Sequence, residues 1–237
     1  MQIHLPKPLH GWRAFAGEVG VIVLGVLIAL AAQQVAEEIH QRSEARSARE
    51  SIQNELATYM SRAESRRAMR DCVARRLDEI QALLDNAGPD GSIKTPKWVG
   101  RPQIWTLLTV RWDAESHSGR AALLPAAELA DFGTMYDWMR NTYDSMLVEQ
   151  GDWARLRTLE HMHKLSPEMV FELNNVLQDA RYRAWRVNGQ IDELRGLAKQ
   201  ANLPTLKNQI PGTRAACLPM TMPREQAARL SNPSGEP

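Results

Sequence analysis

Residues 19 to 36, VGVIVLGVLIALAAQQVA, form a run of eighteen uncharged residues. A helix of roughly 20 apolar residues crosses a bilayer core of about 30 Å, and 17 is near the lower limit. Valine, isoleucine and leucine occur around the whole circumference of this helix, so it must be buried in protein or surrounded by lipid. We therefore predict a transmembrane helix over residues 14 to 36, preceded by a tail of residues 1 to 13.

Two other interpretations of this run remain open. Lys7 and Arg13 precede it, and Ala29-Leu30-Ala31 before Ala32 has the pattern of a cleavage site, so the run could be a removed signal peptide. It could also be a core helix of a soluble protein. Lys and Arg are nearly balanced on its two sides and decide little about orientation. Because the chain after the run is exported under either membrane interpretation, we expect a cytoplasmic N-terminus and place residues 37 to 237 outside the cytoplasm.

Small residues four apart occur twice in the predicted span. Ala16 pairs with Gly20 and Gly25 with Ala29. Pairs of this kind let two membrane helices approach closely. We treat these four residues as a candidate packing face for a homodimer or for the helix of a partner.

The pattern of the remaining chain is helical. From Val35 to Asn86 there is no glycine or proline, and between Ile52 and Leu84 a mostly apolar track that also holds Arg66 and Arg70 recurs alternately four and three apart. This pattern predicts one helix continuous with the span. The sequence NAGPDG, 86 to 91, should end it. A second helix is expected over residues 103 to 119, a third from Pro125 to about His163, and a fourth from Pro167 to residue 201, with Ser166 as its N-cap.

The apolar seam of the last of these helices predicts lengthwise packing against another long helix. The expected fold is all-α: a transmembrane helix continuing into a long helix, with an antiparallel bundle of three to four helices outside the cytoplasm over residues 37 to 202. Residues 203 to 237 contain six prolines and are expected to form a loop-like, partly disordered tail.

The chain contains two cysteines, Cys72 and Cys217. A single long-range pair is what a disulfide in an oxidising compartment would look like, and it would pin the tail. Two unrelated buried thiols are the alternative. No Cys-x-x-Cys occurs, so an active-site thiol is less attractive.

The charge balance is flat, with 29 Lys and Arg against 28 Asp and Glu, so nucleic acid is not an expected partner. A local exception is the arginine-rich stretch from Arg62 to Arg76. Arg62, Arg66 and Arg70 are a candidate anion patch, although such a run is usually a solvated helix face.

Trp105 and Trp112 are seven residues apart, a spacing that places them on one face of the helix expected at 103 to 119. They belong to the core or, together with Arg111 and Trp138, line a ligand pocket. Motifs for phosphate loops, dinucleotides, zinc proteases and nucleophile elbows are missing from the sequence. On a helix, His161 and His163 would point about 200° apart and would not share a metal unless this segment is a loop or strand, and a third zinc ligand is not evident nearby. We therefore predict no catalytic residue, no metal site and no cofactor.

The segment GWRAFAGEVGVIVLGVLIALAAQQVAEE, 11 to 38, is similar to the opening of a family of uncharacterised bacterial single-pass membrane proteins. The likeness extends more weakly to RPQIWTLLTVRWDAESHSG, 101 to 119. This resemblance implies an uncleaved anchor in the inner membrane of a diderm bacterium and a helical periplasmic domain. It implies no activity.

Three functions remain as hypotheses. The first is a membrane-tethered interaction or assembly protein without catalytic activity, in contact with membrane lipid and with a protein partner or a second copy. The second is a periplasmic sensor-like module that binds a ligand and acts through a partner. The third is an undetected hydrolase that uses His117 or His161.

Overall fold

The computed structural model describes residues 11–203 and 215–231. The elements are, in chain order, α1 (Trp12–Arg67), α2 (Arg70–Asp85), α3 (Val110–His117), the 3-10 turn η1 (Arg120–Leu123), α4 (Ala126–Leu156), the 3-10 turn η2 (Arg157–His161), α5 (Pro167–Gln200), the 3-10 turn η3 (Ala215–Cys217) and α6 (Arg224–Ser231). Within the described ranges the β-type pairing is limited to one isolated bridge, Ser92 with Lys164. The all-α class is confirmed, whereas most of the predicted tail at residues 1 to 13 lies outside the described residues.

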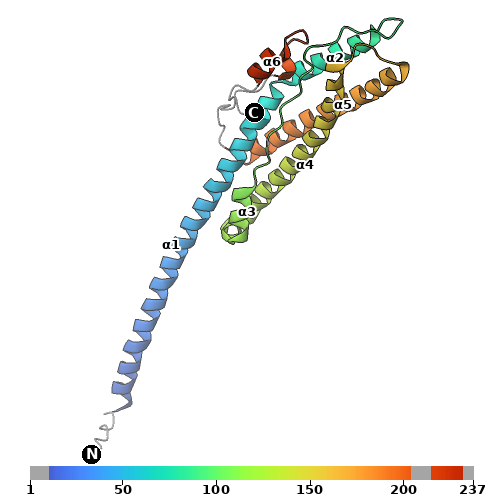
Figure 1. The fold of residues 1–237 in the computed structure, drawn as a ribbon. Helices are drawn as coiled ribbons and strands as arrows, with labels where there is room; N and C mark the ends of the chain where they lie inside the picture. The colour runs from blue at the N-terminus through green and yellow to red at the C-terminus, as the bar shows by residue number, and fades with distance from the viewer. Residues whose placement is uncertain (1–10, 204–214, 232–237) are drawn as a thin grey trace, which may run out of the picture.

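α1 is a helix of 56 residues that begins at Trp12, contains the whole apolar run and ends inside a helical bundle (Figure 1). At 1.5 Å per residue it is about 84 Å long. The side chains of residues 15–43 are exposed, and Ala48 is the first residue of α1 that is buried. Because none of the apolar window is covered by protein, the interpretation as a core helix of a soluble domain is wrong.

The helix predicted from Val35 to Asn86 is interrupted, so α1 and α2 are two helices. At the interruption the N–H of Met69 donates to the carbonyl of Arg66 at 3.1 Å, three residues back, before the Val73 N–H resumes the normal pattern. The sequence has no glycine or proline here that would have indicated it. The end of α2 is as expected, with Asn86 as the cap residue.

The core of the bundle consists of two hydrophobic clusters. The first cluster joins three helices: the part of α1 that lies in the bundle, the first half of α4 and the second half of α5. It includes Ile52, Tyr136 and Ile191. The second joins α2 to the end of α4 and the first half of α5, and includes Leu77 and Trp153. α4 and α5 lie side by side in opposite directions (Figure 1), and ion pairs such as Arg183 with Asp152 link them.

α5 begins as the sequence predicts. The Ser166 hydroxyl accepts a hydrogen bond from the Met169 N–H at 3.3 Å, and Pro167 occupies the first helical position. The apolar seam of α5 is buried against α2 and α4; its buried members include Leu173, Leu177, Ala180, Ala184, Val187, Ile191 and Leu194. This seam holds the bundle together and is therefore not available to a partner.

The segment between α2 and α3 runs back along the bundle in extended form (Figure 1). The prediction of a helix over residues 103 to 119 is wrong in its first half, since residues 101–109 are not helical and α3 starts at Val110. Trp105 and Trp112 consequently do not share a helix face.

The tail is more ordered than predicted where it is described. Residues 215–217 form η3, and Arg224–Ser231 form α6, which packs near η3 (Figure 1). Ala227 is buried on Trp98 and Ala215 in a small cluster of their own. Short helices form here because the bundle supplies an apolar surface, which composition alone does not reveal. Residues 204–214 and 232–237, also expected to be loop-like, lie outside the described residues.

Candidate functional site

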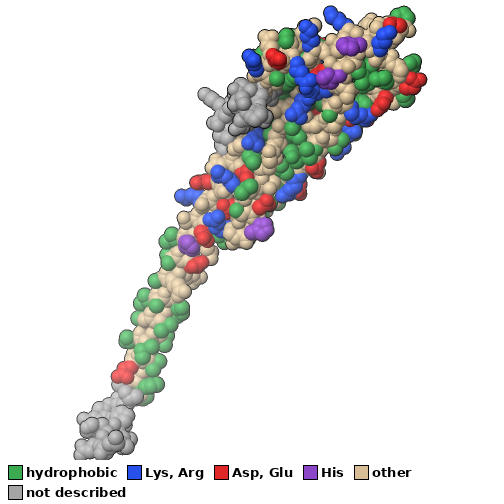
Figure 2. Space-filling view, in the orientation of Figure 1, with side chains coloured by type: hydrophobic (Ala, Val, Ile, Leu, Met, Phe, Trp, Pro, Cys, Tyr) green, Lys and Arg blue, Asp and Glu red, His purple; other side chains and the backbone are tan. Residues whose placement is uncertain are grey.

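The exposed part of α1 is an apolar cylinder. Figure 2 shows hydrophobic side chains on the free part of the rod and charged side chains mainly over the bundle. Val21 is 72% exposed and Ile28 61%, values that would leave large side chains in water if the protein were soluble. This stretch is long and apolar enough to cross a membrane, so lipid is the surrounding that its composition suits.

The four small residues proposed for packing in the span do not form one face. A helix turns by about 100° per residue, so Ala16 and Gly20 lie close together, whereas Gly25 and Ala29 lie about 180° from them. A Cβ atom added at Gly20 or Gly25 would meet nothing within 4 Å. The span therefore offers two opposite small-residue patches, each of two residues.

The four residues proposed as a ligand pocket occupy different environments, and the three tryptophans among them belong to one hydrophobic cluster. Trp105 is buried and meets Tyr59 edge to face at 5.9 Å, whereas Trp112 stacks on Tyr136 with ring centroids 4.8 Å apart. Arg111 is exposed, and Trp138 packs at the edge of the core. Trp105 and Trp112 are therefore structural, because each has an aromatic partner on a neighbouring helix.

The start of α3 is determined by a residue that the sequence pattern did not single out. Glu55 of α1 is 5% exposed, and its carboxylate accepts hydrogen bonds from the N–H groups of Arg111 at 2.9 Å and Trp112 at 3.3 Å. It also accepts one from the Tyr136 hydroxyl at 2.7 Å. The carboxylate thus caps free N–H groups in the first turn of α3. The extended segment that precedes this helix ends at Thr109.

The three arginines proposed as an anion patch have three different environments. Arg62 donates to the carbonyl of Thr106 at 3.1 Å, and Arg70 is half exposed, 3.8 Å from Asp192. Arg66 is completely buried and paired with Glu149 of α4 at 2.7 Å. The anion-patch prediction is wrong, because its central arginine is neutralised inside the core.

The Arg66–Glu149 pair lies between the two hydrophobic clusters. Ala63 and Met146 belong to one cluster, while Met69 and Trp153 belong to the other. Arg66 Nε, Arg66 Nη1 and Glu149 Oε2 are buried without hydrogen-bond partners. The sequence did indicate the burial of Arg66, because this residue falls at a position of its helix where apolar residues recur four and three apart. It did not indicate that the partner is Glu149, 83 residues away.

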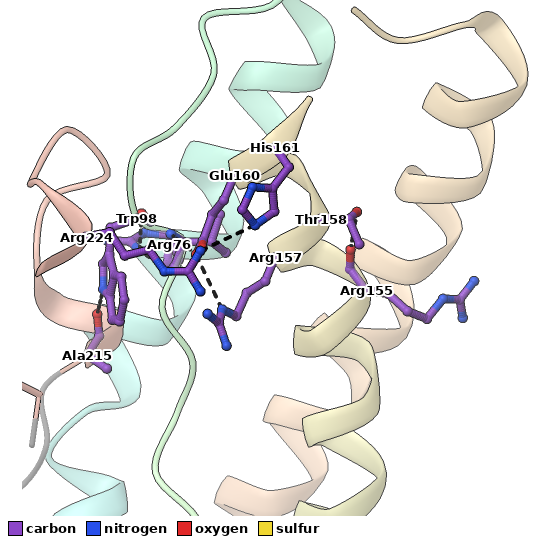
Figure 3. A network of polar contacts seen from close by, with 10 residues as sticks. Arg76, Trp98, Arg155, Arg157, Thr158, Glu160, His161, Ala215 and Arg224 are labelled. Carbon is purple, nitrogen blue, oxygen red and sulfur yellow. Dashed lines mark hydrogen bonds and ion pairs between the residues drawn. The ribbon is translucent and has the colours of Figure 1, made fainter. Parts of the chain in front are cut away.

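A second group of charges joins four segments at the end of the bundle remote from the span. We call Arg76, Trp98, Arg157, Glu160 and Arg224 the distal clasp (Figure 3). Glu160 is nearly buried; its Oε1 accepts from the Val99 N–H at 2.9 Å and faces Arg157 Nε at 3.3 Å. Its Oε2 faces Arg224 of α6 at 3.9 Å. The carboxylate thereby connects η2 to the extended segment and to the tail.

Arg76 supplies the other half of the distal clasp. Its buried guanidinium donates to the carbonyls of Trp98, Val99 and Leu218, and to Glu79 at 2.8 Å. Burial lowers the pKa of Arg76, and the hydrogen bond to Glu79 opposes this shift. The Trp98 indole donates to the Ala215 carbonyl at 2.9 Å. Each group holds a different chain segment, so the distal clasp is a structural joint.

Cys72 and Cys217 form a disulfide that spans 145 residues. It attaches η3 to α2 beside the distal clasp, so the tail is fixed covalently as well as by hydrogen bonds. This is the pairing that the sequence predicted.

The histidines proposed for chemistry are dispersed. His117 Nδ1 contacts the Asp113 carbonyl, His163 Nδ1 contacts Thr95, and His161 Nε2 lies 3.4 Å from Arg224. Among the residues that the structure describes, no three His, Cys, Asp or Glu side chains gather as a metal site would require. No serine, histidine and carboxylate arrangement of a hydrolase is found around them in the same residues.

Comparisons with known proteins add no assignment. No protein-family model matches the chain, and neither curated proteins nor solved structures give a match.

Proposed function

We propose that this chain is a membrane-tethered assembly protein without catalytic activity, which holds a helical domain at a set height above a bilayer. The observation that carries the proposal is the continuity of α1, whose first part is an exposed apolar cylinder and whose last part lies in the core of the bundle. A helix with no break between the two parts transmits the position and tilt of the span to the domain.

We further propose the orientation expected from the sequence, with a cytoplasmic N-terminus and a periplasmic domain in a bacterial inner membrane. The disulfide supports an oxidising compartment for the bundle. A cysteine introduced at Val148, which is 50% exposed, should react in intact cells with a maleimide that cannot cross the inner membrane. Reaction only after the inner membrane is opened would reverse the proposed orientation.

A partner would meet one of two surfaces, because the α5 seam is buried. One is the span. The other is the outer face of α5, where Phe171, Tyr182 and Trp185 are 70%, 56% and 67% exposed and Tyr182 lies against Trp185. Exposed aromatic residues are typical of protein interfaces.

The assembly proposal is tested with a photo-crosslinking residue placed in the full chain in its native membrane. At Tyr182 and in the span at Gly25 we expect adducts that are larger than one chain. Leu177, five residues before Tyr182 on the same helix, is the matched control, because its side chain is fully buried and should give only intrachain products. Absence of intermolecular adducts at both test positions would contradict the assembly function.

The ligand-sensor alternative lacks a comparable observation. Trp105 and Trp112 are each packed against a tyrosine, and Arg111 is at the surface. These positions therefore favour the assembly function over the sensor.

A further inference from the structure

The end of the bundle nearest to the span is formed by α3, η1 and the first turn of α4 (Figure 1). We call residues 110–130 the proximal tip. It is fixed on α1 by the Glu55 cap of α3 and by the ion pair of Arg49 with Glu128 at 2.6 Å. If α1 spans a bilayer, the proximal tip is the part of the domain that faces the membrane surface.

The exposed residues of the proximal tip are mostly small and apolar. They include Val110, Ala122, Leu123, Pro125, Ala126, Ala127 and Ala130. Val110 is 73% exposed, the highest value among the large hydrophobic residues outside α1 in the described ranges. Within the tip, the run from Ala121 to Ala127 carries no charge, and its exposed members are suited to the boundary between headgroups and acyl chains.

The charges of the proximal tip favour a phospholipid surface. Two of its acidic side chains are neutralised by arginines: Glu115 is buried and pairs with Arg120 at 2.9 Å, and Glu128 pairs with Arg49. Asp113, half-buried, accepts a hydrogen bond from Thr109. Arg111, in contrast, is exposed. Basic side chains near a membrane are attracted by anionic headgroups.

The length of α1 sets the height of the proximal tip. Ala45 is the first α1 residue that packs against the core, nine residues after Ala36 at the end of the apolar run. Nine residues of helix correspond to about 14 Å, and the headgroup layer covers about 5–7 Å of that distance. Membrane helices are tilted by about 20° on average. A tilt of α1 by this angle lowers the far edge of the bundle, two interhelix distances from the α1 axis, by about 6 Å toward the membrane. Such a tilt toward the bundle closes the gap.

We infer that the proximal tip rests on the phospholipid headgroups of the bilayer that α1 crosses, as a second membrane contact that fixes the tilt of the rod. This inference depends on the proposed membrane tether. The ligand is the lipid surface itself, contacted by the exposed residues Ala122, Leu123, Pro125, Ala126 and Ala127, with Arg111 at the edge.

The test uses the full chain in vesicles of phosphatidylcholine and phosphatidylglycerol. A spin label is attached to Leu123→Cys, while the native cysteines stay in their disulfide. Leu27→Cys in the span and Pro89→Cys in the exposed loop at the opposite end are the reference positions. Accessibility to oxygen, which concentrates in the membrane, is compared with accessibility to a water-soluble nickel chelate.

We expect the oxygen-to-nickel ratio at Leu123→Cys to be several-fold higher than at Pro89→Cys and lower than at Leu27→Cys. Adding Ala126→Asp and Ala127→Asp should bring the ratio down toward the Pro89→Cys value. Ala154→Asp, an exposed substitution far along α4, should leave it unchanged.

Three results would overturn the inference. Equal ratios at Leu123→Cys and Pro89→Cys, with a membrane value at Leu27→Cys, would reject the surface contact and keep the tether. A water-like ratio at Leu27→Cys would reject the tether itself. Shielding of Leu123→Cys from both reagents, with spin broadening that disappears on dilution with unlabelled chain, would show that a second copy covers the tip.

Discussion

Three buried carboxylates determine much of the architecture, and each acts on a different joint. Glu55 caps α3, and Glu149 neutralises Arg66 between the two hydrophobic clusters. Glu160 connects the chain segments of the distal clasp. A buried charge without a partner is costly, so each carboxylate specifies the segment that must lie beside it. These residues connect positions 56, 83 and 61 apart in sequence.

Breaking the buried ion pair should destabilise the domain strongly. Glu149→Gln leaves the Arg66 charge uncompensated, and we expect a loss of about 3–5 kcal/mol in unfolding free energy. The double variant Arg66→Met/Glu149→Leu should recover most of this loss, because three atoms of the pair already lack hydrogen bonds. Chemical unfolding of the full chain in detergent, followed by circular dichroism, measures both.

The control for this experiment is Arg70→Met. Arg70 is half exposed and 3.8 Å from Asp192, so its loss should cost less than about 1 kcal/mol. An effect of Glu149→Gln no larger than that of Arg70→Met would contradict the role given to the buried pair.

Two buried tyrosines make the fold sensitive to alkaline pH. Burial raises the pKa of Tyr59, and burial followed by the hydrogen bond to Glu55 raises the pKa of Tyr136. Folding therefore favours their protonated forms. Their contribution is complete below the unfolded tyrosine pKa of about 10 and decreases as the pH rises above it.

Tyr59→Phe should make thermal stability fall less steeply above about pH 10, at a cost of about 1 kcal/mol at neutral pH for the lost bond to the Met139 carbonyl. Melting temperatures measured across this range give the slope. Tyr182→Phe is the control, because Tyr182 is exposed. Parallel curves for the wild type and Tyr59→Phe would reject this assignment.

At the scale of elements, the disulfide and the distal clasp fix η3 and α6 to the bundle. The sequence indicated the first of these attachments through its cysteine pair. It did not indicate α6, because the apolar contact that stabilises this short helix is Trp98 from the extended segment. Isolated helices of eight residues are unstable without such a surface.

Replacing both cysteines by serine should lower the unfolding free energy by up to about 5 kcal/mol in the chain-entropy model. It should also increase hydrogen exchange in residues 224–231. Exchange in α5 should change less, since α5 is held by the core. On non-reducing gels the wild type should run faster than Cys72→Ser, and identical mobility would show that the disulfide is not formed in the purified chain.

At the scale of the whole molecule, the proposed function makes α1 both the membrane tether and a wall of the domain. A rigid connection of this kind makes the position of the bundle depend on helical phase as well as on length. The apolar cylinder alone would anchor any domain, whereas the unbroken helix also orients this one.

Inserting seven alanines after Gln41 tests this coupling. The insertion raises the bundle by about 10 Å and turns it by only about 20°, because seven residues are close to two helical turns. The chain should stay in the membrane after alkaline extraction, while the oxygen-to-nickel ratio at Leu123→Cys falls to the Pro89→Cys value. Deleting residues 15–36 should release the chain from the membrane. An unchanged ratio after the insertion would mean that the helix between span and bundle is not rigid.

The sequence by itself determined the features that depend on local periodicity and on single residue types. These are the exposed apolar helix, the start of α5 at Ser166 and Pro167, the end of α2 near Asn86, the seam of α5 and the disulfide partners. Each arises from a pattern within one segment or from the presence of two cysteines.

Only the tertiary structure decided which polar residues are buried and where helices begin without local signals. Arg66 is buried because Glu149 lies opposite it. α3 begins at Val110 because Glu55 caps its first turn. The interruption after Arg67 lies at the polar layer between two hydrophobic clusters. The physical reason is the same in each case: the stabilising partner belongs to a distant segment, and its proximity exists only after the helices have packed.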